Sequence, residues 1–276
     1  MNYFKNFKQK FFLNKSVSPD LNTPDFANKK IFTEADYSYL LSLIFERGEV
    51  LCLRDAKGEK KSCNVLRHDV DHDISTALKM AVWERERGIT STYCLLHTAW
   101  YYGCMMEGHY KHSLLLKDSI ARLDELGHEI NFHNNVITTA FLNKINPYDL
   151  LMRELEFFSM NGVDIVGTST HGDALCRKYG YRNFHLFSEI AEVFPPELSE
   201  DCPKEIHEAI GTVSMGEVGL SYEAYGIVGK KYVSDSGGKL ISHLKMPGWG
   251  AATDSSLLTS NVGVYALTHP VWWSFK

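Results

Sequence analysis

The sequence predicts an α/β fold built on a parallel sheet. Apolar segments rich in β-branched and aromatic residues alternate with segments of helical periodicity, and several of the helical segments end at a glycine. Strands and helices that alternate at this spacing form right-handed parallel crossovers. The sheet therefore either closes into a barrel or stays open with helices on both faces.

The first strand and helix follow each other without a gap. NVLRHDV (64–70) has the composition of a strand, and Asp73 or Ser75 can cap a helix that runs through TALKMAVWERER. Gly88 suits the end of that helix, because glycine adopts the left-handed conformation common there. TSTYCLLH (90–97), rich in β-branched and aromatic residues, predicts the next strand.

The later segments continue this alternation. They are a helix over 114–126, a strand over 128–133, a helix over 147–161, a strand over 163–171 and a last strand before His269. Asn146 can cap the third helix, and Pro147 suits its first position. Residues 180–245 show no clear pattern. With no repeat or linker-like tract, we expect one domain over 31–276, preceded by an extension over 1–30.

Composition limits the functions that the chain can have. Its 276 residues include 44% hydrophobic and 23% charged residues, as in an ordinary globular protein, and its net charge of −5 makes nucleic acid a poor partner. The six cysteines form no CxxC pair and indicate a reducing compartment. No segment approaches the roughly 20 apolar residues of a membrane-spanning helix. We therefore expect a cytoplasmic protein.

The first 15 residues, MNYFKNFKQKFFLNK, are basic and aromatic. They contain no acidic residue, and Phe4, Phe7 and Phe11 follow helical spacing. They lack the apolar region and cleavage site of a secretory signal. A basic amphipathic helix of this kind docks on the inner, anionic face of a membrane. The alternative is an arm whose aromatic residues pack on the domain, and the sequence favours neither.

Acidic and histidine side chains follow five of the predicted strands. They are Asp69 and Asp71, then His97, His133, His171 and His269. Because the carboxyl ends of parallel strands meet at one edge of the sheet, we expect these groups to converge. Imidazole and carboxylate together suit zinc or a similar divalent ion, which supports metal-assisted hydrolysis.

The two aspartates divide the chemistry between them. Successive residues of a strand point to opposite sides, so Asp69 and Asp71 share one face and His68 lies on the other. One carboxylate can then bind a metal while its neighbour accepts a proton from water. Arg67 shares this face and can keep Asp69 ionised, although an exposed arginine is the simpler interpretation.

LRHDVD, GHEINFH, STHG and YALTHP, in this order, resemble the motifs of the polysaccharide deacetylase family. The similarity covers residues 31–276 and implies a distorted (β/α) barrel of about seven parallel strands. It implies that Asp69 is the catalytic base, Asp71 and His133 are metal ligands, and His269 assists the leaving group. His128 alternates away from His133 along the strand, and we expect it to be structural.

One position departs from the family pattern. The family has a second metal-binding histidine four residues after the first, and this chain has Ile137 in HNNVI. Isoleucine cannot bind a metal. We expect His171 to complete the site, with Asn134 as the second candidate.

Other readings of the same residues stay open. HDVDHD (68–73) contains DxD, by which glycosyltransferases bind a nucleotide-sugar, but that function leaves the later histidines without a role. A catalytically degenerate barrel that binds glycan is consistent with Ile137. Asp235 lies in a glycine-rich turn that either faces a substrate or is solvated, and Trp272 and Trp273 either stack on a sugar or close the barrel.

The function predicted from the sequence is a metal-dependent hydrolase of amide bonds other than peptide bonds. We expect it to remove an acetyl or formyl group from an N-acylated sugar or polysaccharide precursor. The expected pathway is the assembly of a surface glycan, such as lipopolysaccharide or capsule, and the expected cofactor is a divalent metal, most simply zinc.

Overall fold

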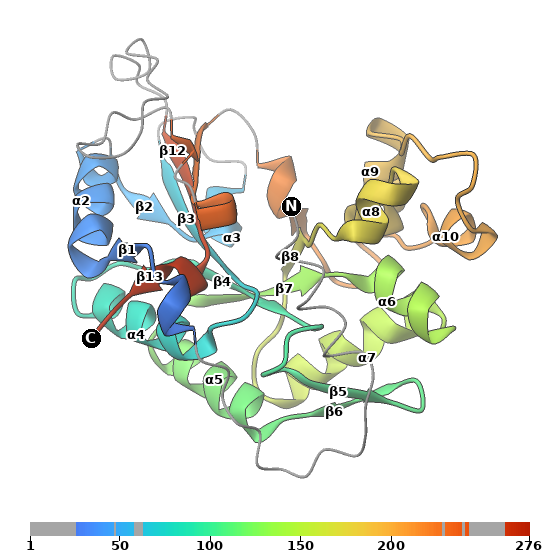
Figure 1. Ribbon diagram of the computed structural model, residues 1–276, viewed down its shortest axis with the longest axis horizontal. Coiled ribbons are helices and arrows are strands. Elements are labelled where there is room, and N and C mark those ends of the chain that lie inside the picture. Colours follow the sequence, from blue (N-terminus) through green and yellow to red (C-terminus); the bar gives the residue numbers. More distant parts are fainter. Residues whose placement is uncertain (1–25, 47, 58–62, 228–229, 239–240, 243–262) are drawn as a thin grey trace.

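The computed structural model describes residues 26–46, 48–57, 63–227, 230–238, 241–242 and 263–276, and its centre is a curled sheet (Figure 1). The strands are, in spatial order, β11 (Ile241–Ser242), β10 (Lys231–Ser234), β12 (Val264–Thr268), β3 (Asn64–Val70), β4 (Thr92–Leu96), β7 (Glu129–Asn134), β8 (Gly167–Thr170) and β9 (Tyr222–Glu223). The seven strands from β10 to β9 are parallel and form a half-barrel, consistent with a (β/α) barrel. β11 is antiparallel, and β2 (Val50–Leu51) pairs with the start of β3.

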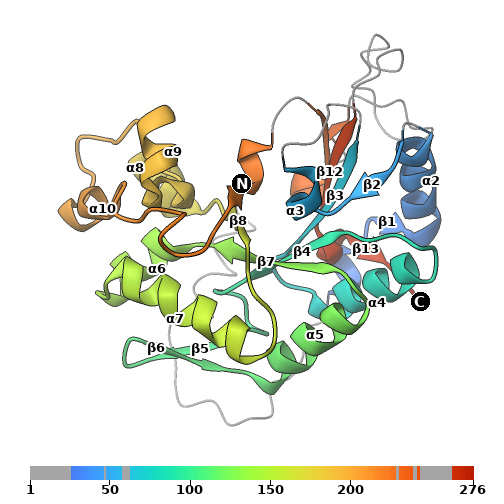
Figure 2. The same ribbon diagram turned by 180° about the vertical axis from the view of Figure 1, so that it is seen from behind.

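Most helices cover the convex side of this sheet. They are α2 (Glu34–Phe45), α4 (Ile74–Arg85), α5 (Leu114–Glu125), α6 (Val136–Asn143) and α7 (Pro147–Met160). The short helix α3 (Leu53–Ala56) packs on the concave side instead, where Leu53 joins Val65 and Tyr265 in a small apolar cluster. Three short helices form a separate group beyond β8, as Figure 2 shows: α8 (Ala174–Tyr179), α9 (Ser188–Val193) and α10 (Lys204–Ala209). Of these helices, α9 and α10 lie within residues 180–245, where the sequence showed no clear pattern.

Two small sheets complete the structure. β1 (Phe32–Thr33) pairs in parallel with β13 (Trp273–Ser274), and β5 (Gly103–Met106) and β6 (His109–His112) form an antiparallel hairpin. Three single-turn helical segments lie between these elements: η2 (Asn183–Leu186), η3 (Ala224–Gly226) and η6 (Pro270–Trp272). The hairpin was not predicted from the sequence.

Local capping explains where the main helices begin. Asp73 accepts a hydrogen bond from the Thr76 N–H at the start of α4, so of the two predicted caps Asp73 is correct. Asn146 accepts from the backbone of Tyr148 and Asp149, with Pro147 at the first helical position of α7. Gly88 has a φ of +69° just beyond α4, as predicted.

The hydrophobic core lies between the convex side of the sheet and the helices. One large cluster joins β4 and β7 to α5 and α7, and a second joins Leu66 of β3 to α2, α4 and the C-terminal strand. Trp273 is fully buried in this second cluster and packs against Phe32 at 4.8 Å between ring centroids. Trp273 therefore closes the fold and is not a sugar platform.

The described part of the expected N-terminal extension contacts the domain. Phe26 is buried, and Lys30 pairs with Asp73 and donates to the Pro270 carbonyl at 3.1 Å. These bonds attach the chain before α2 to the start of α4 and to η6. The basic and aromatic residues 1–15, with their predicted membrane contact, lie outside the described residues.

Two expectations about the environment of the chain can be compared with the structure. All six cysteines carry free thiols. Within the described ranges, none of the helices combines the length and apolar character that crossing a membrane requires.

Candidate metal centre and its acid–base pairs

Strand β3 presents its charged residues to the inside of the half-barrel. The Arg67 guanidinium binds the Asp69 carboxylate, and Asp71 follows directly after the strand on the same face. His133 is paired with Leu96 and Ser169 near the ends of β4 and β8, so it lies at the same edge of the sheet. We call this side the inner face. The predicted convergence at the strand ends is therefore present for the residues of β3 and β7.

Three of the predicted residues form a candidate metal-binding triad. Asp71 Oδ1 lies 3.2 Å from His133 Nε2 and 3.6 Å from His171 Nδ1. The two histidine nitrogens are 3.4 Å apart. All three ligand atoms lie within 4.8 Å of one another, and no other such group of three is found among the described residues. The structure thus brings His171, and not Asn134, to the two expected ligands.

The hydrogen bonding of the triad suits a cation. His133 Nδ1 lies 2.8 Å from the Ser169 carbonyl, which can only accept, so Nδ1 carries the proton and Nε2 presents its lone pair to the triad. Asp71 Oδ1 is buried and has no hydrogen bond of good geometry within the described residues. Burial raises the pKa of Asp71, but His133 and His171 outweigh it and hold that pKa well below its usual range.

These donors fit a divalent metal. Two imidazoles and one carboxylate are a ligand set that zinc accepts, and three protein ligands leave one coordination position for water or substrate. An unpaired, buried carboxylate oxygen between two histidines costs free energy unless a positive charge or a donor faces it. The triad is therefore a candidate site for a cation.

Asp69 lies beside the triad, and its carboxylate is bound by Arg67. Arg67 Nε donates to Asp69 Oδ1 at 2.7 Å, and Arg67 Nη2 donates to Asp69 Oδ2 at 2.6 Å. Both side chains are buried, so the simpler interpretation of an exposed Arg67 was wrong. Burial raises the pKa of Asp69, but Arg67 and His133 outweigh it and lower that pKa. Asp69 Oδ2 is 3.6 Å from His133 Nε2, within reach of a group bound at the triad.

His269 forms the second pair at this edge. Its Nδ1 lies 2.5 Å from Asp235 Oδ1, while Asp235 Oδ2 accepts from the His269 N–H and from Trp273 Nε1. Burial lowers the pKa of His269, but Asp235, Asp71 and Asp69 outweigh it and raise that pKa to about 9. Asp235 is fully buried, which excludes the solvated-turn interpretation. Asp235 is the residue of this site whose role was hardest to predict from the sequence.

Two other histidines, one after the end of β4 and one before the start of β7, lie outside the site. His97 was expected to converge with the others, but it stacks on Phe132 at 5.0 Å and its Nε2 accepts from the Asn135 N–H. Burial lowers the pKa of His97 to about 3. His128 donates from Nε2 to the Ala81 carbonyl, as expected for a structural residue. Both side chains face the helices and not the triad.

The two non-ligand positions after β7 are also explained. Ile137 lies in the hydrophobic core at the first turn of α6. The Asn134 amide donates to the Asn183 carbonyl and its Oδ1 accepts from the Val136 N–H. Asn134 is therefore engaged in local structure, and His171 is the better candidate for the third ligand.

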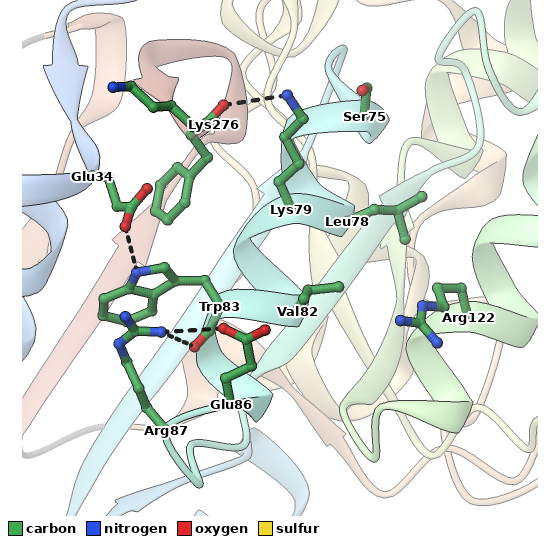
Figure 3. Close-up of a pocket in the computed structure, with 11 residues that line it drawn as sticks. Glu34, Ser75, Leu78, Lys79, Val82, Trp83, Glu86, Arg87, Arg122 and Lys276 are labelled. Carbon is green, nitrogen blue, oxygen red and sulfur yellow. Dashed lines mark hydrogen bonds and ion pairs between the residues drawn. The ribbon is translucent and has the colours of Figure 1, made fainter.

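A surface groove lies on the outer side of α4. It is bordered by Lys79 and Trp83 of α4, by Arg87 just beyond that helix, and by the C-terminal residues (Figure 3). The Arg87 guanidinium lies 3.7 Å from the centre of the Trp83 ring. None of the residues that line this groove belongs to the triad or to its two flanking pairs.

Comparisons with known proteins give no name to this arrangement. No protein-family description matches the chain, and neither the curated proteins nor the solved structures contain a significant match.

Proposed function

We propose that the protein is a metal-dependent hydrolase that removes an acyl group from an N-acylated sugar. The observation that carries this proposal is the placement of two differently tuned groups beside one triad. Asp69 is held ionised by Arg67, and His269 is held protonated by Asp235. Amide hydrolysis needs an ionised base and a protonated acid together at one pH, and these two groups meet that requirement.

Asp71, His133 and His171 would hold the ion. A divalent metal there supplies a Lewis acid that polarises the acyl carbonyl and lowers the pKa of a nearby water. His133 is oriented for this by its bond to the Ser169 carbonyl. The resemblance to polysaccharide deacetylases supports zinc as the native metal.

Asp69 is the proposed general base. Its lowered pKa keeps it ionised at neutral pH, so it can accept a proton from the attacking water. The bidentate bond to Arg67 fixes the carboxylate without blocking all of its lone pairs. The Tyr225 ring covers the Arg67 guanidinium, with 4.9 Å between Cζ and the ring centroid, and excludes water from that side.

His269 is the proposed general acid. With a pKa of about 9 it is protonated at neutral pH and can donate to the leaving amine. Asp235 binds Nδ1, so Nε2 is the nitrogen left to deliver the proton. A protonated amine leaves much more readily than an amide anion, which is why an amide hydrolase requires such a group.

The glycosyltransferase alternative is less well supported. DxD motifs bind a metal through both carboxylates, yet Asp69 is held by Arg67 and Asp73 caps α4 and pairs with Lys30. Only Asp71 of the three aspartates in HDVDHD is left to bind a metal. The sugar substrate and a role in surface-glycan assembly rest on the family resemblance.

Metal content and acyl release test this function together. We expect the purified protein to bind one divalent ion per chain and to release acetate or formate from members of a panel of N-acylated nucleotide-linked and lipid-linked sugars. His133→Ala should lose the ion. His128→Ala, the same substitution next to the same strand but on its other face, should keep it. A wild-type protein that binds no divalent metal would remove the mechanism and favour a barrel that binds glycan without turnover.

A further inference from the structure

The backbone of His171 is held by asparagine side chains and carbonyls from other segments. His171 lies one residue beyond β8, and the last bond of the β7–β8 pairing fixes only its N–H. Its N–H donates to the Asn134 carbonyl at 2.7 Å, and its own carbonyl accepts from Asn183 Nδ2 at 3.0 Å. The backbone N–H and the carbonyl of His171 are therefore both hydrogen-bonded by residues outside its own segment.

Asn183 connects His171 to the start of α6. Its amide also donates to Asn135 Oδ1 at 2.8 Å, and its Oδ1 accepts from the Thr138 N–H at 3.2 Å. The Asn183 carbonyl accepts from the Asn134 amide at 3.1 Å. The Asn183 side chain is fully buried, so its bonds to Asn135 and Thr138 form away from water. A buried amide whose donors and acceptor are all used holds its partners in one arrangement.

This connection bears on the metal ligand that the resemblance predicts at position 137, where this chain has isoleucine. A histidine at position 137 would be held by α6 itself, whereas His171 stands on a loop and its side chain is 23% exposed. A metal ligand must be fixed to within about 0.5 Å to bind well. His171 therefore needs support from elsewhere, and Asn183 links its carbonyl to the helix that carries Ile137.

We propose that Asn183 is a positioning residue of the metal centre, which fixes His171 as the ligand that replaces the one absent at Ile137. The proposal rests on the metal centre proposed above, but not on the identity of the substrate. Asn183 touches neither the ion nor the substrate and acts only through the backbone of His171.

The test is the Zn²⁺ dissociation constant, measured by competition with a chromophoric chelator. Asn183→Leu keeps the approximate volume and removes every side-chain hydrogen bond. We expect the Kd for Zn²⁺ to rise about 10- to 100-fold, as for other groups that orient a metal ligand. Asn183→Ala, which adds no steric demand, should give the same result if the leucine variant folds poorly.

Asn64→Leu is the matched control. Asn64 is also fully buried, its amide donates to the Gly48 carbonyl at 2.8 Å, and its Oδ1 accepts from the Val264 N–H at 2.9 Å. It lies at the opposite end of β3 from Asp71, so its loss should lower the melting temperature without a comparable change in Kd.

A double-mutant cycle separates positioning from general damage. In a His171→Ala background the Asn183→Leu substitution should change the Kd by less than about 3-fold, because the ligand through which it acts is gone. An equal rise in Kd with and without His171, or a folded Asn183→Leu with the wild-type Kd, would overturn the proposal. Failure of acyl release with normal Zn²⁺ binding would instead overturn the proposed reaction and leave the role of Asn183 standing.

Discussion

The two faces of β3 carry charged clusters of opposite character. On the inner face Asp71 Oδ1 is buried and lacks a hydrogen bond within the described residues, although two histidines lie beside it. On the outer face His68 contacts Glu84 at 2.9 Å and Thr268 at 2.6 Å. Glu84 also accepts from Ser91, Tyr93 and Tyr37. The buried carboxylate oxygen of the inner cluster lacks a hydrogen-bond partner in the described part of the chain, whereas the carboxylate of the outer cluster has partners on both oxygens.

This difference separates a site from a structural network. Both clusters combine histidine with carboxylate in a buried place, so residue type and burial do not distinguish them. Burial raises the pKa of Glu84, but His68, His128 and Ser91 outweigh it and lower that pKa to about 2. A carboxylate with this many partners has no lone pair left for a ligand, whereas Asp71 has. Unused hydrogen-bonding capacity is therefore the more useful sign of function.

The largest difference between the faces should appear in turnover. Asp69→Asn keeps the shape of the side chain and removes the proton acceptor, so we expect turnover to fall by about 10²- to 10⁴-fold. Metal should stay bound, because Asp69 is not a member of the triad. Steady-state rates and metal content of the same preparation check both expectations. Loss of the ion in this variant would make Asp69 a ligand, and near-normal turnover would exclude it as the base.

The outer face should respond in stability instead. Glu84→Gln leaves His68 and its other donors with a poorer acceptor, and we expect the free energy of unfolding to fall by about 3 kcal/mol. Because the pKa of Glu84 is lowered from 4.5 to about 2, its contribution is present above pH 4.5 and is lost as pH falls through about 2.

Chemical denaturation of the wild type and Glu84→Gln between pH 2 and 7 measures this effect. The two stability curves should converge at the acid end. The Kd for Zn²⁺ should not differ between the two proteins at pH 7. A variant that keeps its stability but loses metal would contradict the assignment of the outer cluster to structure.

A smaller effect concerns the acid pair on the inner side. A general acid must be protonated, so turnover should fall as pH rises through the pKa of His269, about 9. Asp235→Asn removes the negative charge that raises this pKa, and the alkaline limb of the pH–rate profile should move toward the ordinary histidine value near 6.5. Turnover near pH 6 should be affected least. An alkaline limb that stays in place would show that another group supplies the proton.

Strand alternation predicted much of the inner face. Asp69 and Asp71 share a side and His68 lies opposite, as expected from the two-residue period. The same reasoning applied to β4 excludes His97, because Cys94 is paired with Asp69 and the third residue after it points to the other side. The expectation for His97 was therefore wrong because of a strand register that only the structure shows.

The partners of the site residues were harder to predict. Asp235 and His269 are 34 residues apart, and Asp235 lies in a stretch where the sequence shows no pattern. Asn183 lies in the same stretch and contacts His171 from a single turn of helix. Such contacts depend on how loops pack after the sheet has formed, and no local periodicity reports them. Arg67 was identified as a neighbour of Asp69, but its burial depends on Tyr225 and Tyr265 from the end of the chain.

The position of β12 also has a consequence for how the protein folds. β12 pairs with β3 although His68 and Thr268 are 200 residues apart in the chain, and His269 follows directly after it. Pairing between strands so distant in sequence is slow, because most of the chain must be ordered first. During synthesis β3, β4, β7 and β8 all precede β12, so a growing chain carries three triad residues before it can carry the acid pair. The proposed metal centre can therefore assemble before the pair that would supply its general acid.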